Sequence, residues 1–366
     1  MKIRLVKPYF TTQEVVEVLK TLDSGMVAQG PRVEKFEKEF AEYCGAKHAI
    51  AVNSCTSGLY LSLLALGVGK GDKVIVPDFT FVATGNAVLQ TGASVDIVDV
   101  DKETFCMDVG EIEDRICHNT KAIIPVHALG HPANIPELIK ITNEHNLNII
   151  EDAASGVGSM IGDKKVGSFG NISCFSLQGR KIITTGEGGI ITVNDNKLAE
   201  RLRSLRSQGA PHFQFCGFSC RLSDIQACIG SVQLGRIDIF IERRRYLASL
   251  YNDLITDAHI PVDMPICKKG YKHTYQAYVV LVKNRDKVIK ELGRRGIESS
   301  IGTHSLSSMP LFENNKICSN GKSIYKDSLA LPIYHELTED DIEYVVGCLK
   351  EVVDKGTTRN SRRSGK

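Results

Sequence analysis

A lysine next to an apolar segment has the most reactive chemistry in this sequence. Lys181 follows the run CFSLQGR, which is typical of a strand and its end, and precedes the Thr- and Gly-rich turn IITTGEGG. A lysine amine held by a rigid element can form a Schiff base with an aldehyde and later carry a proton. Most lysines in loops are only solvated, so this position is informative only together with other signals.

Two carboxylates end a second apolar run. The segment LNIIEDAASGVGS is typical of a buried strand that stops at Glu151 and Asp152. An acid at a strand end can face a ligand crevice, and a carboxylate beside a pyridine nitrogen keeps that nitrogen protonated, which makes the ring an electron sink. The alternative interpretation is a solvated strand end.

Small polar residues open a helix after a third strand. In AIAVNSCTSGLYLSLLALG, residues Cys55, Thr56 and Ser57 stand where free N–H groups at a helix start can cradle a phosphate. The ordinary alternative is a helix N-cap without a ligand. The nearby GVGKGDK is not a P-loop, because no Ser or Thr follows the lysine and the glycine spacing differs.

Alternating strands and helices must position these residues. Short apolar runs (HAIAV, KVIVP, SVDIV, AIIPV and LNIIE) alternate with helix-like segments at residues 56–66, 84–90 and 135–145, and an amphipathic helix is predicted at 31–44. This pattern predicts a mostly parallel sheet flanked by helices, an α/β fold. The pieces ISCFS and GGIITV suit strands at the far side of the same sheet.

A long periodic segment from Leu222 to Leu254 predicts a helix, or a bent pair of helices, that joins two domains. The strand TYQAYVVLV, the helix DKVIKELGRRG and a final helix from Thr338, whose Thr-x-x-Asp opening resembles a capping box, predict a smaller α+β domain. We therefore expect a large domain over residues 1–240, a small domain over 241–354 and a disordered polar tail at 355–366.

Composition excludes several classes of function. The 45 Lys and Arg nearly balance the 43 Asp and Glu, so no global field draws the chain to nucleic acid or to an anionic membrane. The start MKIRLVKPYF lacks a signal-peptide pattern and no apolar run can span a bilayer, so we expect a cytoplasmic protein with small-molecule partners. The scattered cysteines favour reduced thiols, and Cys216 and Cys220 lack zinc-type spacing, so no metal is expected.

Five segments together resemble those of a known family in their order and separations. They are NSCTSGLYLSLLALGVGKGD, VIVPDFTFVATGNAV, IIEDAASGVGS, CFSLQGRKIITTGEGG and SCRLSDIQACIGSVQL. The family is DegT/DnrJ/EryC1/StrS, which comprises sugar aminotransferases, and the resemblance runs from about Gly25 to the final helix. It implies a fold-type I transferase fold, pyridoxal 5′-phosphate (PLP) as the cofactor, and a homodimer with shared active sites.

The resemblance also implies a role for individual residues. Lys181 matches the Schiff-base lysine, and Asp152 matches the acid that pairs with the pyridine nitrogen. Phe81 matches the aromatic residue that stacks on the cofactor ring. The implied contacts to the cofactor phosphate come from Ser176, Thr56 and the backbone at Cys55.

Three positions depart from the family pattern. Ser155 stands where the family usually has Gln after the acid, so the contact to the ring hydroxyl of the cofactor is expected to pass through water. Ser219 replaces an Asn that contacts the phosphate from the neighbouring subunit, and Ser307 stands where many members carry His. These departures leave the identity of the substrate open.

The implied reaction moves an amino group from glutamate to a nucleotide-linked keto-sugar and yields 2-oxoglutarate. One alternative is a related sugar 3-dehydratase, in which the lysine position is typically His, so Lys181 disfavours it. The other alternative is a non-catalytic PLP-binding regulatory protein. The nucleotide, the sugar and the choice between C3 and C4 amination depend on variable loops and are not predicted.

Overall fold

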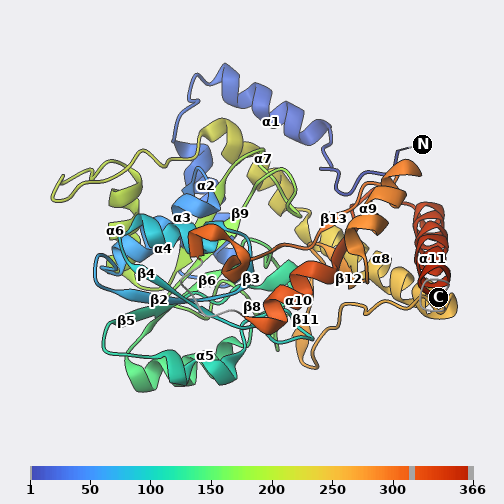
Figure 1. The fold of residues 1–366 in the computed structure, drawn as a ribbon. Coiled ribbons are helices and arrows are strands. Elements are labelled where there is room, and N and C mark those ends of the chain that lie inside the picture. The colour runs from blue at the N-terminus through green and yellow to red at the C-terminus, as the bar shows by residue number, and fades with distance from the viewer. Residues whose placement is uncertain (1, 313–317, 362–366) are drawn as a thin grey trace.

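A seven-stranded sheet forms the centre of the larger of two bodies (Figure 1) in a computed structural model that describes residues 2–312 and 318–361. Its strand order is β1-β10-β9-β6-β5-β2-β4. The strands are β1 (His48–Val52), β2 (Lys73–Pro77), β4 (Ser94–Val98), β5 (Thr120–Ile123), β6 (Asn148–Asp152), β9 (Ile172–Ser176) and β10 (Gly189–Val193). The β2, β4, β5, β6 and β9 strands pair in parallel, whereas β10 is antiparallel to both β1 and β9. The predicted mostly parallel sheet is confirmed.

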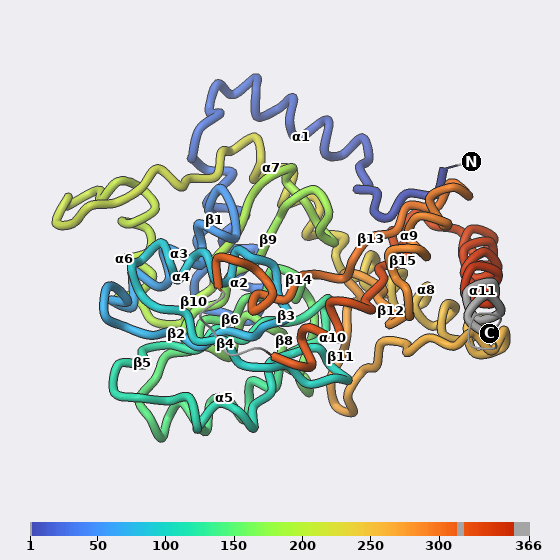
Figure 2. The backbone as a smooth tube through the Cα atoms, viewed as in Figure 1, coloured from blue at the N-terminus to red at the C-terminus, as the bar shows by residue number. Residues whose placement is uncertain are grey.

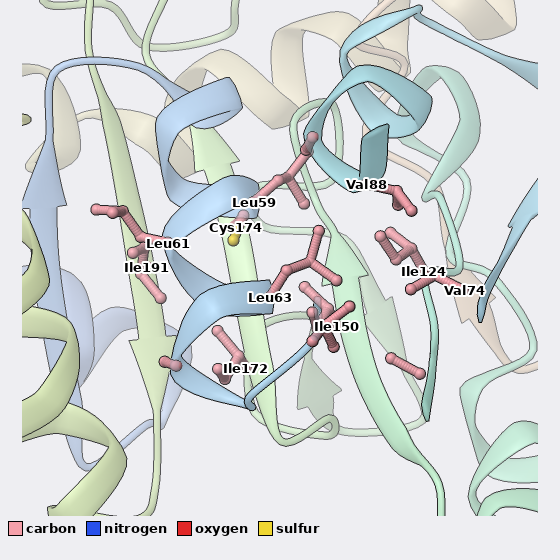
Figure 3. Close-up of a cluster of buried hydrophobic side chains, with 14 of the residues drawn as sticks. Leu59, Leu61, Leu63, Val74, Val88, Ile124, Ile150, Ile172, Cys174 and Ile191 are labelled. Atoms are coloured by element: carbon pink, nitrogen blue, oxygen red, sulfur yellow. The ribbon is translucent and has the colours of Figure 1, made fainter. Parts of the chain in front are cut away.

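Alternate residues of each strand pack against opposite layers of helices, as a period of two requires. On β1, Ile50 and Val52 belong to one buried cluster, whereas Ala49 and Ala51 belong to another. The first layer contains α3 (Cys55–Ala65), α4 (Ala83–Gln90) and α6 (Asn196–Arg206), and the second contains α2 (Pro31–Cys44) and α5 (Ile135–His145). Figure 3 shows Leu59 and Leu63 of α3 beside sheet residues of the first cluster.

A bent pair of helices leads from the larger body to the smaller one. Of the two alternatives that the sequence left open, the structure has the pair of helices, α7 (Asp224–Leu234) and α8 (Ile237–Asp257). Along α8, Phe240 and Ile241 are buried in the core of the larger body, whereas Leu247 and Tyr251 are buried in the core of the smaller body. Ile3 also lies in the smaller core, although the sequence placed it in the large domain.

The smaller body is built on a three-stranded sheet. Its order is β12-β15-β13, and both pairings are antiparallel. Its elements are β12 (Tyr278–Leu281), α9 (Arg285–Arg294), β13 (Ser300–Ile301), β15 (Ser328–Leu331) and α11 (Glu339–Ser361). The predicted capping box is present, because Thr338 and Asp341 exchange side-chain to backbone hydrogen bonds of 3.1 Å. The backbone of residues 355–361, expected in a disordered tail, continues α11, and the rest of that tail lies outside the described residues.

The described residues contain further elements outside the two main sheets and their helix layers. They are α1 (Thr12–Asp23), β3 (Phe79–Thr80), β7 (Met160–Ile161), β8 (Lys164–Lys165), β11 (Tyr271–Lys272), β14 (His304–Ser305), α10 (Ser319–Asp327) and several 3-10 turns. Residues 207–219 form an arm that projects from the larger body (Figure 2). Within the described part of the chain, no helix combines the length and apolar character needed to cross a membrane. No disulfide bond joins the eleven cysteines, all of which lie in the described residues.

Candidate active site

Four of the residues singled out in the sequence lie at one edge of the central sheet. Asp152 ends β6, Ser176 ends β9, Cys55 opens α3 directly after β1, and Lys181 follows the turn after β9. The carboxyl ends of parallel strands share one edge, which is where open α/β sheets bind ligands. The topology therefore brings together segments that are far apart in the sequence.

Lys181 is held in a partly exposed position beside Ser155. Its Nζ donates a hydrogen bond to Ser155 Oγ at 3.2 Å. Desolvation by the surrounding protein lowers the pKa of the Lys181 ammonium, and the nearby groups Cys55 and Asp152 offset this effect only in part. Among the described residues no carboxylate forms an ion pair with Lys181. The amine is therefore placed to lose its proton, as a nucleophile towards a carbonyl must.

Asp152 is buried and accepts two hydrogen bonds. Thr84 Oγ1 donates to Oδ2 at 2.7 Å, and the backbone N–H of Ala154 donates to Oδ1 at 3.1 Å. Burial raises the pKa of the Asp152 carboxyl, and the hydrogen bond from Thr84 opposes this shift. A desolvated carboxylate gains more than a hydrated one from a cationic hydrogen-bond donor, so Asp152 suits a protonated ring nitrogen.

Glu151, the neighbouring acid, instead binds other parts of its own chain. It is fully buried and accepts hydrogen bonds from His127 Nε2 at 3.0 Å and from Ser173 Oγ and Gly170 N, each at 2.7 Å. Nδ1 of His127 accepts from the Ala133 N–H, so Nε2 carries the proton that is donated to Glu151. Desolvation raises the pKa of Glu151, but the hydrogen bonds outweigh it and the net pKa is lowered.

The start of α3 offers free backbone donors at the same edge. Ser54 caps the helix by accepting from the Ser57 N–H at 3.1 Å. The first N–H groups of a helix have no intrahelical partner, which leaves those of Cys55 and Thr56 for a ligand. A Cβ added to Gly189, the first residue of β10, would lie 2.5 Å from Cys55 N and from Ser54 C. The start of α3 therefore packs directly against the first residue of β10.

Phe81 stands at the rim of this edge and is 61% exposed. It directly follows β3, which pairs with β14 and so brings His304 to a ring-centroid distance of 6.2 Å from Phe81. The Phe81 carbonyl accepts from the Thr84 N–H at 3.2 Å, so one turn links Phe81 to the Thr84 hydroxyl that binds Asp152. An exposed aromatic ring in this position can cover a planar ligand.

The remaining predicted residues have different environments. Ser176 Oγ accepts a long hydrogen bond of 3.4 Å from the Gln178 N–H. Ser307 lies on a loop anchored to the rim, where its backbone N–H donates to Asp78 Oδ1 at 2.6 Å. Ser219 is exposed at the base of the projecting arm, where it forms a β-bridge with Ser207.

The groups at this edge match the four chemical parts of PLP. A lysine amine can bind an aldehyde, a buried carboxylate can bind a pyridine nitrogen, an exposed ring can cover the ring face, and free helix N–H groups can bind a phosphate. Two contacts were missed in the sequence, the Thr84 hydroxyl on Asp152 and the Gln276 amide beside Lys181. Thr84 lies in the quoted TFVATG segment, whereas no local pattern indicates Gln276.

Comparisons with known proteins agree with this geometry. The profile of the DegT/DnrJ/EryC1/StrS aminotransferase family matches residues 8–350. GDP-perosamine synthase from Caulobacter vibrioides is 39% identical over 96% of this chain and 98% of its own length. The structure of DesV from S. venezuelae has a TM-score of 0.89 at 31% identity and covers 93% of this chain and 94% of its own.

A solved structure also identifies the cofactor. The PLP form of the Spr1654 protein from Streptococcus pneumoniae has a TM-score of 0.92 at 25% identity and covers 97% of this chain and 99% of its own. Both the predicted fold-type I architecture and the predicted cofactor are confirmed. The chain belongs to the DegT/DnrJ/EryC1/StrS aminotransferase family, and it is an aminotransferase that uses PLP.

Proposed function

We propose that this enzyme transfers an amino group from glutamate to a keto-sugar attached to a nucleotide. The observation that carries the proposal is the meeting of Lys181, Asp152 and the start of α3 at one edge of the sheet. The similar protein from C. vibrioides is named GDP-perosamine synthase, which supports a sugar nucleotide as substrate and makes GDP-linked sugars the first to test.

Each predicted site residue has a proposed part in holding the cofactor. The backbone N–H groups of Cys55 and Thr56, together with the Ser176 hydroxyl, hold the phosphate. Phe81 covers one face of the ring, and Asp152 holds the proton on the ring nitrogen. Ser155 is the polar group beside Lys181, and its hydroxyl is too short to replace a glutamine without a bridging water.

Lys181 both holds the cofactor and moves a proton. When bound, PLP supplies an aldehyde and a ring that withdraws electrons from the substrate carbon. Lys181 gives way to the amine of the amino donor, and its freed amine takes the proton from the donor α-carbon. Burial lowers the pKa of Lys181, which favours the neutral amine that this step needs. Water supplies the keto oxygen of 2-oxoglutarate, which leaves at the end of this half-reaction. The same residues would then act in reverse on the keto-sugar, so that the amino group from glutamate replaces the sugar carbonyl oxygen, which leaves as water.

The two alternative functions have less support. A sugar 3-dehydratase of this family typically has His at the lysine position, and this chain has Lys181. A non-catalytic PLP-binding protein does not need an amine with a lowered pKa beside a buried acid that suits the ring nitrogen.

Amino transfer is tested with purified protein, glutamate and a panel of GDP-, UDP- and dTDP-linked keto-sugars, with mass spectrometry of the products. We expect one class of sugar nucleotide to exchange its carbonyl for an amine, and Lys181→Ala to form no product. Loss of a sugar hydroxyl would instead identify a dehydratase, and no product with any sugar would contradict the proposed substrate class.

We also propose a homodimer in which each active site takes Ser219 from the partner subunit. The arm that carries Ser219 projects from its own body (Figure 2), and Phe213, halfway along residues 207–219, is 70% exposed. Phe215 on the same arm is also exposed, and neighbouring exposed aromatic residues are typical of a surface that packs on another protein chain.

Mixing two inactive variants tests this shared site. Ser219→Asp puts a negative charge beside the phosphate, and Lys181→Ala removes the amine. If the sites are shared, subunit exchange should restore activity towards about a quarter of wild type, since half of the dimers are mixed and each has one intact site. Mixing Asp152→Asn with Lys181→Ala is the matched control and should restore nothing, because both residues come from one chain. No recovery in the first mixture would contradict the shared site.

A further inference from the structure

A buried glutamine contacts the backbone on both sides of Lys181. Gln276 Oε1 accepts a hydrogen bond from the Ile182 N–H at 3.0 Å, and its Nε2 donates to the Arg180 carbonyl at 2.7 Å. The Gln276 side chain is only 7% exposed. Both polar atoms of one amide therefore bind the main-chain groups that flank a single residue, which fixes the position and orientation of the Lys181 backbone.

Arg244 and the local chain path hold Gln276 in turn. Arg244 on α8 is 4% exposed, and its Nη1 donates to the carbonyls of Tyr275 and Gln276, each at 3.1 Å. Tyr275 has φ 49°, a left-handed conformation that is costly for an aromatic residue. A Cβ added to Gly130 would lie 2.9 Å from Gln276 N, so the larger body also packs closely on this segment.

We propose that Gln276 is a positioning residue for Lys181. It does not contact the reacting atoms. It acts through the backbone of residues 180–182, and its amide sets the direction from which the Lys181 amine reaches the cofactor and the substrate carbon. Gln276 lies just before β12, so the same contacts tie the placement of the catalytic lysine to the smaller body. The inference rests on the proposed role of Lys181 as the lysine that holds the cofactor.

Two substitutions separate the contacts of Gln276. Gln276→Met keeps the length of the side chain and removes both hydrogen bonds. Gln276→Glu keeps an acceptor for the Ile182 N–H but turns a carboxylate oxygen towards the Arg180 carbonyl, which cannot donate to it. Tyr278→Phe is the matched control, because it removes a hydrogen bond of 2.7 Å to Asn252 from the same strand region without touching the Lys181 segment.

Three measurements distinguish positioning from simple support of the fold. Urea unfolding gives the free energy of unfolding of each variant, so that variants of comparable stability can be compared. The rate at which an amine-reactive reagent labels Lys181 in the cofactor-free protein is followed against pH by mass spectrometry of the peptide. Single-turnover rates are then measured for the glutamate and the keto-sugar half-reactions.

We expect Gln276→Met to slow both half-reactions by about 10- to 100-fold, the usual effect of a misplacement near 1 Å. The pH midpoint of Lys181 labelling should rise towards that of an ordinary lysine, because a displaced amine becomes better hydrated. Tyr278→Phe should leave labelling and rates unchanged at comparable stability. Gln276→Glu should slow both half-reactions at least as much as Gln276→Met, because its buried carboxylate is repelled by the Arg180 carbonyl.

The inference is overturned if Gln276→Met loses stability but labels Lys181 and turns over like wild type. If Gln276→Met does not fold, the same measurements on Gln276→Glu, compared with Tyr278→Phe, decide whether the inference holds. A failure of the proposed function is recognised separately in the wild-type protein. In that case borohydride reduction leaves no cofactor on the Lys181 peptide, and the inference fails with it.

Discussion

Replacing Asp152 with asparagine tests whether this acid acts on the cofactor or only stabilises the fold. The asparagine Oδ1 can still accept from the Ala154 N–H, which lies 3.1 Å from the aspartate oxygen. The Thr84 hydroxyl, 2.7 Å from Oδ2, can accept from the new amide and donate to Thr80 Oγ1, 2.8 Å away. The hydrogen-bond network can reverse without moving an atom far, so we expect the variant to fold.

The stability of this variant without cofactor follows from the pKa of the acid. Burial raises the pKa of Asp152 in the folded protein, so the folded state binds this proton more tightly than the unfolded chain does. Stability therefore falls as pH rises from the ordinary carboxyl pKa through the raised one, and the charged form remains a cost at neutral pH. Asp152→Asn removes that cost, and its melting temperature at pH 7 should equal or exceed that of wild type.

Activity should respond in the opposite direction. A hydrogen bond to a charged group contributes about 1.5–3 kcal/mol, and about 1.36 kcal/mol changes a rate tenfold. Losing the carboxylate should therefore slow the glutamate half-reaction by about 10- to 150-fold even before the loss of the electron sink is counted. Stopped-flow absorbance measures the rate, and equilibrium dialysis checks that cofactor still binds. A wild-type rate at full occupancy would mean that Asp152 is only a strand-end acid.

Three further substitutions test other parts of the site. Gly189→Ala places a Cβ 2.5 Å from Cys55 N and should weaken cofactor binding roughly tenfold or more by dialysis, whereas Gly347→Ala, with no atom within 4 Å of the new methyl outside its own helix, should not. Phe81→Ala should change the free energy of unfolding by less than about 0.5 kcal/mol and still weaken cofactor binding, and unchanged binding would show that the ring does not cover the cofactor. Glu151→Gln should cost roughly 1–3 kcal/mol in urea unfolding at pH 7. The stability from Glu151 is present above its unfolded pKa and is lost as pH falls through the lowered folded pKa, so an equal deficit at all pH values would contradict the buried network.

Local patterns in the sequence were sufficient to predict the helices and strands that build the site. The predicted helix at 31–44 is α2, because Pro31 stands at its first position and Gly45 ends it in a left-handed conformation with φ 72°. Runs such as KVIVP became buried strands because both faces of the sheet are covered. Once the strands are parallel, Asp152 and Lys181 must meet at their carboxyl edge, so the position of the site followed from the pattern.

Contacts between distant segments were not predictable in the same way. Gln276 binds the Ile182 backbone across 94 residues of sequence, and nothing in the segment HTYQAY indicates that contact. The different surroundings of Glu151 and Asp152 also depend on tertiary partners, since His127 and Thr84 come from separate elements. The projecting arm was not predicted, because residues 207–219 show no helix or strand periodicity that would indicate how far they extend.

Whether Lys181 holds the cofactor is decided by the peptide that keeps PLP after borohydride reduction. The purified, PLP-loaded protein is reduced, digested and analysed by mass spectrometry, with Lys181→Ala treated in parallel. We predict that the wild-type protein is yellow and retains the cofactor on the peptide that contains Lys181, and that the variant retains none and does not transaminate. Cofactor fixed to another lysine, or normal turnover by Lys181→Ala, would contradict the assignment.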